Sequence, residues 1–574
     1  MDLSQRKDVP IMKKWLPILL ILTLLCGCGT DPAADPTESG SAAHPAVTDP
    51  VYPEIPYVSR FDTETVISLS DDSISVGNLS IDAANTADGG VYISHDIIYY
   101  EDRDAYDSGN PYGEGSDADK HSADEAAAHT VVNITLPGAY RITGKLSAGQ
   151  IRIDLGEEAR DDENAVVELI LDNADITCTV APAILFLNVY ECDGDWSVDT
   201  AGSTVDTSAA GANLILEGEN TVSGAYVAKI YKDKEGEKKL WKQDGALYSY
   251  MSLNVYGPGT LDLTAENEGL DSELHLTVNG GNINIRSGND GINTNEDGVS
   301  VTTINAGTLH IIAGLGEEGD GIDSNGYLVI NGGTVVASAN PAADAGLDSD
   351  LGSYINGGTV VALGSTMDWA ESDSEQVTMN LQFADFRNST DSIAITYPDG
   401  TLVFAYDPSR DEVLGDNTRR YQGAIISSPN LRVGQGYHVY LGSTVEGNEV
   451  GGIYQASTVT AFTGGTQMMY TGSDVGMGGM GGPMPGGQMP EGIAPPEDFT
   501  RPEGDFQIPE QPSMPDNVPA GMEGQPPEGR DPNSDGGRIR PGGTPGDNQA
   551  PGAGNTLFYI SDKVNAFSGI TAAN

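Results

Sequence analysis

Four short acidic segments recur in the middle of the chain and offer side-chain oxygens of the kind that bind hard cations. Each has the order glycine, apolar residue, Asp or Asn, and Ser or Thr. The polar third position is filled by Asp271, Asn293, Asp323 and Asp348. Adjacent parallel strands lie about 4.8 Å apart, and carboxylates at that spacing repel unless a cation or hydrogen bonds intervene. This pattern predicts a bound Ca²⁺ close to Asp323 and Asp348, because a site with many oxygens suits that ion.

Other oxygen-bearing side chains accompany this acidic series. The candidate metal ligands are Asp271, Asn293, Asp320, Asp323, Asn325, Asp344, Asp348 and Asp350. The alternative is that each Asp or Asn caps its own turn through hydrogen bonds to the backbone, with no metal.

Catalytic patterns are missing from the sequence. It has no G-x-S-x-G, no H-E-x-x-H and no zinc-ligand spacing, and its 7 histidines are scattered. A lyase acting on uronic acids needs a Lys or Arg base, yet Arg286 is the only Lys or Arg between Lys242 and Arg387. We therefore expect no catalysis, with a pectate-type lyase as the alternative. The aromatic residues that could stack on sugar rings are Trp241, Tyr248, Tyr250, Tyr256, Tyr327 and Tyr354.

The segments that must position these residues form a repeat. Asn279, Asn305, Asn331 and Asn356 follow one another at intervals of 26, 26 and 25 residues, each followed by glycine or alanine and then a short alternating strand. A fixed period in this range indicates a repeat architecture. An array of hairpins is one alternative, because Asn-Gly favours hairpin turns. An array of hairpins, however, does not explain why the same Gly-apolar-Asp-Ser motif occurs in every unit.

Stacked parallel strands do give such a reason, because the same turn recurs on every level, and Gly and Asn tolerate positive φ there. We predict an all-β fold, a right-handed parallel β-helix, with residues 61–475 as its domain and the regular rungs at 244–364. Leu270, Ile292, Ile322 and Leu347 are expected to stack as one interior column. Residues 365–475 are predicted to be either terminal rungs or a β cap.

The ends of the chain have a different composition. Residues 1–28 resemble a lipoprotein signal peptide, in which Lys13 and Lys14 precede an apolar run and Cys28 closes a lipobox. Met12 is the expected start, and a plain signal peptide is the alternative. Residues 29–60 are predicted to be a flexible tether and residues 476–554 a disordered Met/Gly/Pro-rich excursion. Residues 555–574 are expected to return to the fold as a strand.

Charge and cysteine content agree with an exported protein. The formal net charge is −57, from 85 acidic and 28 basic residues, which excludes a nucleic-acid partner and favours divalent cations. We expect a monomer on the extracellular face of the membrane, held only by its lipid anchor. Cys178 and Cys192 form a disulfide or fill the core as small apolar side chains, and the sequence leaves both open.

The repeats resemble a known family. Asp244-Gly245-Ala246-Leu247-Tyr248-Ser249 and the Gly-apolar-Asp-Ser rungs with their Asn-Gly-Gly-Thr strands are similar to the carbohydrate-binding domain-containing proteins of Gram-positive, clostridial-type bacteria. The resemblance implies a right-handed parallel β-helix, bound calcium, and non-catalytic binding of cellulose-like and acidic plant polysaccharides. Rungs of that family commonly carry Lys where this chain has Asp271, Asn293, Asp323 and Asp348. A structural adhesin or spacer that binds no sugar is the remaining alternative.

Overall fold

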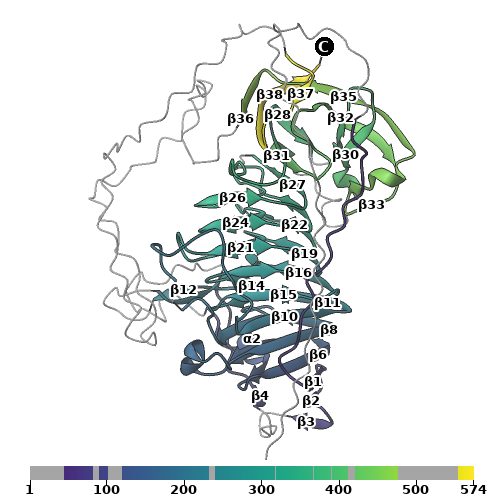
Figure 1. Cartoon of the computed structure of the whole chain (residues 1–574). Helices are drawn as coiled ribbons and strands as arrows, with labels where there is room; N and C mark the ends of the chain where they lie inside the picture. Colours follow the sequence, from purple (N-terminus) through teal and green to yellow (C-terminus); the bar gives the residue numbers. More distant parts are fainter. Residues whose placement is uncertain are drawn as a thin grey trace, which may run out of the picture. The chain divides into compact units, whose positions relative to one another are not determined.

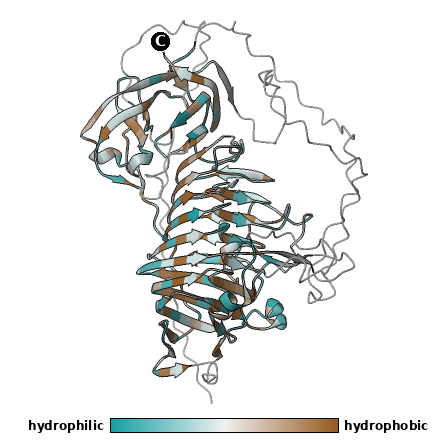
Figure 2. Cartoon of the chain, turned by 180° about the vertical axis from the view of Figure 1, so that it is seen from behind, coloured by the Kyte–Doolittle hydropathy of each residue, from teal (hydrophilic) through white to brown (hydrophobic). Residues whose placement is uncertain are grey.

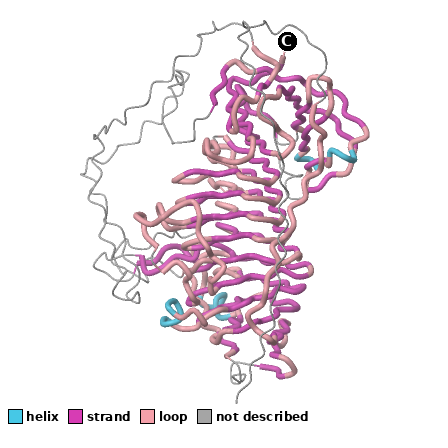
Figure 3. The backbone as a smooth tube through the Cα atoms, in the orientation of Figure 1, coloured by secondary structure: helices cyan, strands magenta, loops and turns pink. Residues whose placement is uncertain are grey.

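The computed structural model describes residues 44–81, 90–100, 119–194, 196–231, 239–316, 318–365, 368–388, 391–410, 420–475 and 554–573. The chain divides into the units Met1–Ala46 and Val47–Asn574, and the fold described below is that of the second unit. It is nearly all β, with large parallel sheets (Figures 1 and 3). The predicted all-β class is therefore confirmed. None of the helices in these ranges is both long and apolar enough to span a membrane.

Three series of parallel strands make up most of this unit. The first comprises β5 (Thr130–Ile134), β7 (Gly149–Asp154), β9 (Ile184–Asn188), β14 (Gly245–Ser249), β17 (Glu268–Ser272), β20 (Ile292–Thr294) and β23 (Ile322–Ser324). The second comprises β10 (Ala212–Glu217), β15 (Leu253–Tyr256), β18 (Leu276–Val278), β21 (Val301–Ile304), β24 (Tyr327–Ile330) and β26 (Gly352–Ile355). The third comprises β11 (Glu219–Gly224), β16 (Thr260–Ala265), β19 (Asn282–Ser287), β22 (Thr308–Ile312), β25 (Thr334–Ser338) and β27 (Thr359–Gly364).

The first three repeats each contribute one strand to each series, whereas the fourth contributes β26 and β27 and only an isolated bridge to the first series. Strands of successive repeats pair in parallel without a change of register. Leu270 pairs with Ile292 and Ile292 with Ile322, while Ile322 bridges to Leu347. These side chains are fully buried, so the predicted interior column is confirmed. Figure 2 shows the same alternation as apolar positions recurring along the stacked strands.

Glycine has two separate roles in the repeat. After the Asn of each repeat, Gly281, Gly307, Gly333 and Gly358 have φ between 80° and 94°, which an L side chain rarely adopts. The glycine of the acidic motif has no positive φ. A Cβ at Gly291 would lie 2.6 Å from the Gly321 carbonyl oxygen of the next strand. The expectation of positive φ in the acidic motif is therefore wrong, and close approach between strands is the reason for glycine there.

The remaining elements lie at the two ends of the stack or protrude from it. At the first end are β1 (Glu64–Leu69), β2 (Ile74–Val76), β3 (Leu79–Ile81), β4 (Val91–Ser94), β6 (Gly138–Leu146) and β8 (Val167–Cys178), with α2 (Ala123–Ala127) and the 3-10 helix Glu157–Asp161. Strand β8 pairs with both β10 and β11 and so begins the second and third series. Strands β12 (Val227–Tyr231) and β13 (Lys239–Gln243) form a separate antiparallel pair.

Antiparallel strands follow the last repeat. They are β28 (Thr378–Asn388), β29 (Ile393–Thr396), β30 (Leu402–Tyr406), β31 (Arg420–Ser427), β32 (Gly436–Glu446), β33 (Glu449–Val450), β34 (Ile453–Tyr454), β35 (Ala461–Met469), β36 (Gly472–Val475), β37 (Phe558–Tyr559) and β38 (Val564–Ala572), with 3-10 helices Pro408–Arg410 and Ala456–Thr458. Strand β31 pairs antiparallel with β27 and β28, whereas β38 pairs parallel with β28. Together with Ile312, Val336 and Val361 of the third series, they form a second apolar cluster, separate from the main one inside the stack.

Candidate functional site

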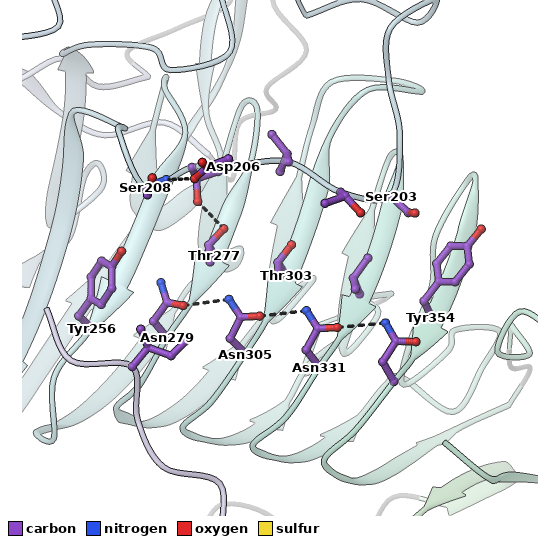
Figure 4. Close-up of a pocket in the computed structure, with 16 residues that line it drawn as sticks. Ser203, Asp206, Ser208, Tyr256, Thr277, Asn279, Thr303, Asn305, Asn331 and Tyr354 are labelled. Carbon is purple, nitrogen blue, oxygen red and sulfur yellow. Dashed lines mark hydrogen bonds between the residues drawn. The ribbon is translucent and has the colours of Figure 1, made fainter. Parts of the chain in front are cut away.

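A groove of about 350 Å³ crosses the strands of the second series (Figure 4). Two columns of side chains, set by the register of β15, β18, β21, β24 and β26, form its floor. One column begins at Tyr256 and continues through the repeated Asn. The other passes through Thr277, Thr303 and Val329 and ends at Tyr354. The groove therefore runs along the stacking direction, with a tyrosine ring at each end.

The repeated asparagines form a hydrogen-bonded ladder along the groove. Asn305 Nδ2 donates to Asn279 Oδ1 at 2.9 Å, and Asn331 Nδ2 donates to Asn305 Oδ1 at 2.9 Å. Asn356 Nδ2 donates to Asn331 Oδ1 at 3.0 Å. An amide has two N–H donors and an oxygen with two lone pairs, and these ladder bonds use one N–H of each donor and one lone pair of each acceptor. The remaining donors and lone pairs are what a ligand rich in hydroxyl groups requires.

Residues 203–208 form one wall of the groove. The buried Thr207 fixes this loop to the floor, because its Oγ1 lies 2.7 Å from both Asn254 Oδ1 and Thr277 Oγ1. Asn254 Nδ2 in turn donates to the Thr207 carbonyl oxygen at 2.8 Å. The Asp206 carboxylate accepts a hydrogen bond from the Ser208 N–H at 3.0 Å. This wall comes from a connection outside the regular repeats, and sequence periodicity gives no sign of it.

An N-terminal segment borders the other side of the groove. Residues 47–61, which we call the strap, run beside the stacked strands as the purple segment of Figure 1. The Ile55 N–H donates to the Asn279 carbonyl oxygen at 2.9 Å, and Ile55 lines the groove. The Tyr57 ring packs on that of Tyr256, with 4.7 Å between centroids. The strap includes most of the stretch 44–60, which the sequence predicts to be a flexible tether.

The structure separates the six aromatic candidates. Tyr256 and Tyr354 line the groove, and the Tyr327 ring lies 6.2 Å from that of Tyr354. Tyr248 is fully buried and packs edge-on against Tyr250 at 5.1 Å. Tyr250 donates from its hydroxyl to the Lys242 carbonyl oxygen, and the side chain of Trp241 lies outside the described part of the structure. Neither Tyr248 nor Tyr250 lines the groove.

The polar residues of the four acidic motifs, Asp271, Asn293, Asp323 and Asp348, lie on successive levels, and we call them with their acidic neighbours the acidic column. The column begins in a buried cluster around Lys242. Lys242 Nζ pairs with Asp244 at 3.0 Å and donates to Asn295, while Asn295 Nδ2 donates to Asp271. Burial lowers the pKa of Lys242, but the surrounding carboxylates, with Asp244 first, outweigh it and hold that pKa well above its usual value. Lys242 therefore neutralises part of the negative charge of this cluster.

Three oxygens of this cluster are buried without a hydrogen-bond partner among the described residues: Glu268 Oε2, Asp271 Oδ2 and Asn293 Oδ1. Burial, and then the neighbouring Glu268 carboxylate, raise the pKa of Asp271 well above its usual range. Burial likewise raises the pKa of Glu268. Two carboxylates and an amide oxygen match the ligands of a hard cation. In the described ranges, no three His, Cys, Asp or Glu side chains converge with the geometry of a metal cage.

Further along the column, carboxylates cap the turns of neighbouring repeats. Asp290 Oδ1 accepts the Asp320 N–H at 2.7 Å, and Asp320 Oδ1 accepts the Ala345 N–H at 2.5 Å. Asp344 Oδ2 accepts the Gly319 N–H at 2.9 Å. Asp348 Oδ1 accepts the N–H of the next residue at 3.0 Å. These bonds agree with the turn-cap alternative, except that most of them join one repeat to the next.

The later carboxylates also affect one another's protonation. Burial, followed by the charges of Asp348 and Asp350, raises the pKa of Asp323 to about 7. Burial raises the pKa of Asp320 to about 8, against the opposing effect of its hydrogen bond from Ala345. Burial and then Asp297 and Asp348 raise the pKa of Asp350. Asn325 instead donates to Asp297 Oδ1 at 2.9 Å and to the Asn295 carbonyl oxygen at 3.1 Å.

Two further predictions concern cysteines. Cys178 and Cys192 are both free, so the pairing left open by the sequence is not formed. Cys178 ends β8 with its side chain in the apolar core, while the Cys192 thiol donates to Glu191 Oε1 at 3.6 Å. Cys28 lies outside the described residues, as do residues 476–553.

The comparisons with known proteins concern the part of the chain that forms the stack. Residues 128–380 match the model of the family described as carbohydrate-binding domain-containing protein. This family segment contains the groove floor, the acidic column and Lys242. The resemblance inferred from the repeats is confirmed.

A curated relative and a solved structure were also found. A carbohydrate-binding domain-containing protein of Acetivibrio thermocellus is 27% identical over 176 residues, which cover 30% of this chain and 51% of that protein. The match therefore spans about half the length of that relative. The solved polysaccharide lyase-like protein from C. thermocellum, a gadolinium derivative, has 20% identity and a TM-score of 0.29, covering 52% of this chain and 93% of that one.

Proposed function

We propose that this protein binds a polysaccharide in the groove of the second strand series without cleaving it. The observation that carries this proposal is the asparagine ladder between Tyr256 and Tyr354, because it offers repeated amide donors and acceptors between two aromatic rings. A linear glycan placed along the ladder would meet the same polar group at every strand. Binding sites commonly combine apolar surface with a few fixed polar groups. The family name of residues 128–380 supports carbohydrate as the ligand class.

The groove also bears on the type of glycan. Asp206 is charged, and no Lys or Arg is found among the described residues that line the groove. A polyanionic glycan would meet no basic partner on this floor unless a cation lay between them. We therefore place neutral plant cell-wall glycans before acidic ones. The same lining offers no cationic base for a lyase, which supports binding over catalysis.

The fold that presents the groove is, we infer, a right-handed parallel β-helix. Its support is the constant order of first, second and third series in each repeat, and the parallel pairing between repeats. Connections between parallel strands are right-handed in nearly all proteins.

Calcium is the cation that we propose for the buried cluster of Glu268, Asp271 and Asn293. Their three partnerless oxygens support the proposal, together with burial of more carboxylate charge than Lys242 balances. Bound Ca²⁺ would neutralise the facing carboxylates and hold β17 and β20 together. The proposed ion is thus nearer Asp271 than the site that the sequence predicts at Asp323 and Asp348, where backbone N–H groups already bond to Asp348 Oδ1 and to the neighbouring Asp320 Oδ1.

Retention on insoluble glycans tests the binding function. Tyr354→Ala and Asn331→Ala each remove one polar or aromatic element of the groove, and each should weaken retention on the best-binding glycan severalfold. Tyr559→Ala is the matched control, because that ring is 51% exposed in β37, outside the groove lining. If the two groove variants and the control were retained on the glycan equally well, the glycan would bind at another surface of the protein.

Two further assays distinguish the alternatives. Release of unsaturated products that absorb ultraviolet light, from polygalacturonate with Ca²⁺, would indicate a lyase. Failure to bind any member of a glycan array, with or without chelator, would leave the spacer function.

A further inference from the structure

We propose that the strap is a reversible cover over the Tyr256 end of the groove, and that glycan and strap compete for this end. The inference rests on the proposed function, because the competitor is the glycan. Tyr256 is only 8% exposed, and the ring packed on it is that of Tyr57. A sugar cannot stack on Tyr256 while Tyr57 occupies that face. At the other end, Tyr354 is less buried and remains accessible.

The middle of the strap fits the repeat of the stack beneath it. Pro50, Pro53 and Pro56 recur every third residue, which favours a polyproline II conformation with three residues per turn. Three residues then advance about 9 Å. Two parallel strands advance about 10 Å. One turn of the strap therefore matches two levels of the stack.

The contacts of the strap follow this match. A Cβ at Gly332 would lie 3.7 Å from Tyr52 Cδ1, and three residues later in the strap the Ile55 N–H donates to the Asn279 carbonyl oxygen. Gly332 and Asn279 follow β24 and β18, which are two levels apart in the second series. A Cβ at Gly280, next to Asn279, would lie 3.2 Å from Glu54 Cγ. A segment that only linked two parts of the chain would not need such a match.

The two ends of the strap are held more firmly than its middle. At one end, Asn430 makes two hydrogen bonds with the backbone of Thr48, at 2.8 and 3.1 Å. At the other, Glu168 accepts hydrogen bonds from Ser59 Oγ at 2.6 Å and from the Arg60 N–H at 2.7 Å. Between these clamps, the hydrogen bonds of the described residues are those of Ser457 with the Asp49 carboxylate, the Ile55 N–H bond to Asn279 and a 3.2 Å bond between Tyr52 and Thr359.

The middle of the strap, residues 50–58, also has few groups that hold it to the stack. The three prolines have no N–H to donate to the stack, and Val51 and Val58 are 83% and 80% exposed. Lifting residues 50–58 from the stack would therefore break few polar contacts and leave both clamps in place. It would uncover Tyr256 and make the asparagine column continuous with it.

The test compares glycan affinity of the full chain with that of two strap variants. Tyr57→Ala removes the ring that covers Tyr256. Ile55→Pro removes the N–H bonded to Asn279 while keeping a backbone suited to polyproline II. Both should bind the glycan severalfold more tightly, because less of the protein is in the covered state. Val58→Ala is the control and should match wild type. Circular dichroism and melting curves confirm that each variant is folded.

A second measurement follows the strap itself. Hydrogen exchange at the Ile55 amide should be faster than at amides of β18 and should accelerate when glycan is added. Unchanged or weaker glycan binding by both folded variants, or an Ile55 amide protected by the glycan, would overturn the cover while leaving the binding function intact. If neither wild type nor the strap variants bind any glycan, the proposed function fails, and the cover fails with it.

Discussion

At the scale of single residues, equivalent positions of the repeat have different environments. Glu268 lies in a cluster with Lys242 and has an oxygen that lacks a partner among the described residues, whereas its equivalents Asp290 and Asp320 accept N–H groups from the backbone. The difference arises because Lys242 comes from β13, a strand outside the repeats that has no counterpart at the later levels. A repeated residue type therefore does not imply a repeated role.

Removal of divalent cations should lower the melting temperature, because an ion bound only by the folded state stabilises that state by mass action. Ca²⁺ should restore it better than Mg²⁺, since a site with several protein oxygens suits the larger ion. Glu268→Gln should shrink the difference between chelated and Ca²⁺-loaded protein, and Asp62→Asn, at an exposed site, should not. A melting curve indifferent to chelator would contradict the calcium proposal.

Stability without metal should depend on pH through Asp323. Its folded-state pKa of about 7 is above the value of about 3.9 for a free Asp, so the folded state binds more protons between these values. The free energy of unfolding in chelator should thus be highest near pH 4 and fall as the pH rises through 7. Asp323→Asn should flatten this slope, as measured by denaturant unfolding across that range. An equal slope in wild type and variant would show that other groups cause it.

At the scale of elements, the close approach of adjacent strands in the first series explains why the acidic motif keeps its glycine. Gly269, Gly291 and Gly321 each face the carbonyl oxygen of the glycine on the next level, at 2.4 to 2.6 Å from an added Cβ. The first series is thereby brought close enough for the apolar column behind it to pack without gaps. This explains why the motif keeps glycine where φ does not require it.

Gly291→Ala should destabilise the fold by about 1–3 kcal/mol, the usual cost of overpacking a tight site. The added methyl would lie 2.2 Å from Ile311 Cγ2 as well as against the Gly321 carbonyl. Gly202→Ala is the control, because a Cβ there meets nothing within 4 Å. Denaturant unfolding compares the two variants, and equal stabilities would show that the levels can move apart at little cost.

At the scale of the whole molecule, the parallel stack is followed by antiparallel strands that cover its last level. Strand β31 pairs with β27 of the last repeat, and β38, from the C-terminal end of the chain, pairs with β28. The strap connects both regions, through Asn430 beyond the stack and Glu168 near its start. Segments distant in sequence thus stabilise one unit that includes the groove.

Attachment of the protein to the outer face of the membrane remains a proposal based on Cys28 and its lipobox. Cys28→Ala should release the protein into the medium, because no lipid could be attached at that residue. Cell fractionation and immunoblotting measure the outcome, with Cys178→Ala, a buried core thiol, as the control. Unchanged membrane association of the Cys28 variant would require a different anchor.

The sequence by itself determined the local pattern of the fold. A period of about 26 residues, one buried apolar residue per acidic motif and a glycine after each Asn were enough to predict parallel stacking and the column from Leu270 to Leu347. These features repeat, so each level constrains the next in the same way. The asparagines of the ladder were visible as turn signals, and their fixed interval was the clue to a continuous polar column.

Only the tertiary structure decided which of these residues form a site. The wall at 203–208 and the strap are single segments, and no periodicity specifies where a single segment packs. Burial separated Tyr248, which is inside the fold, from Tyr354, which lines the groove, although both are tyrosines near repeat strands. The protonation of Asp271 and Asp323 likewise depends on charges and burial supplied by residues far away in the chain. Such long-range contacts arise from packing, which the local sequence does not encode.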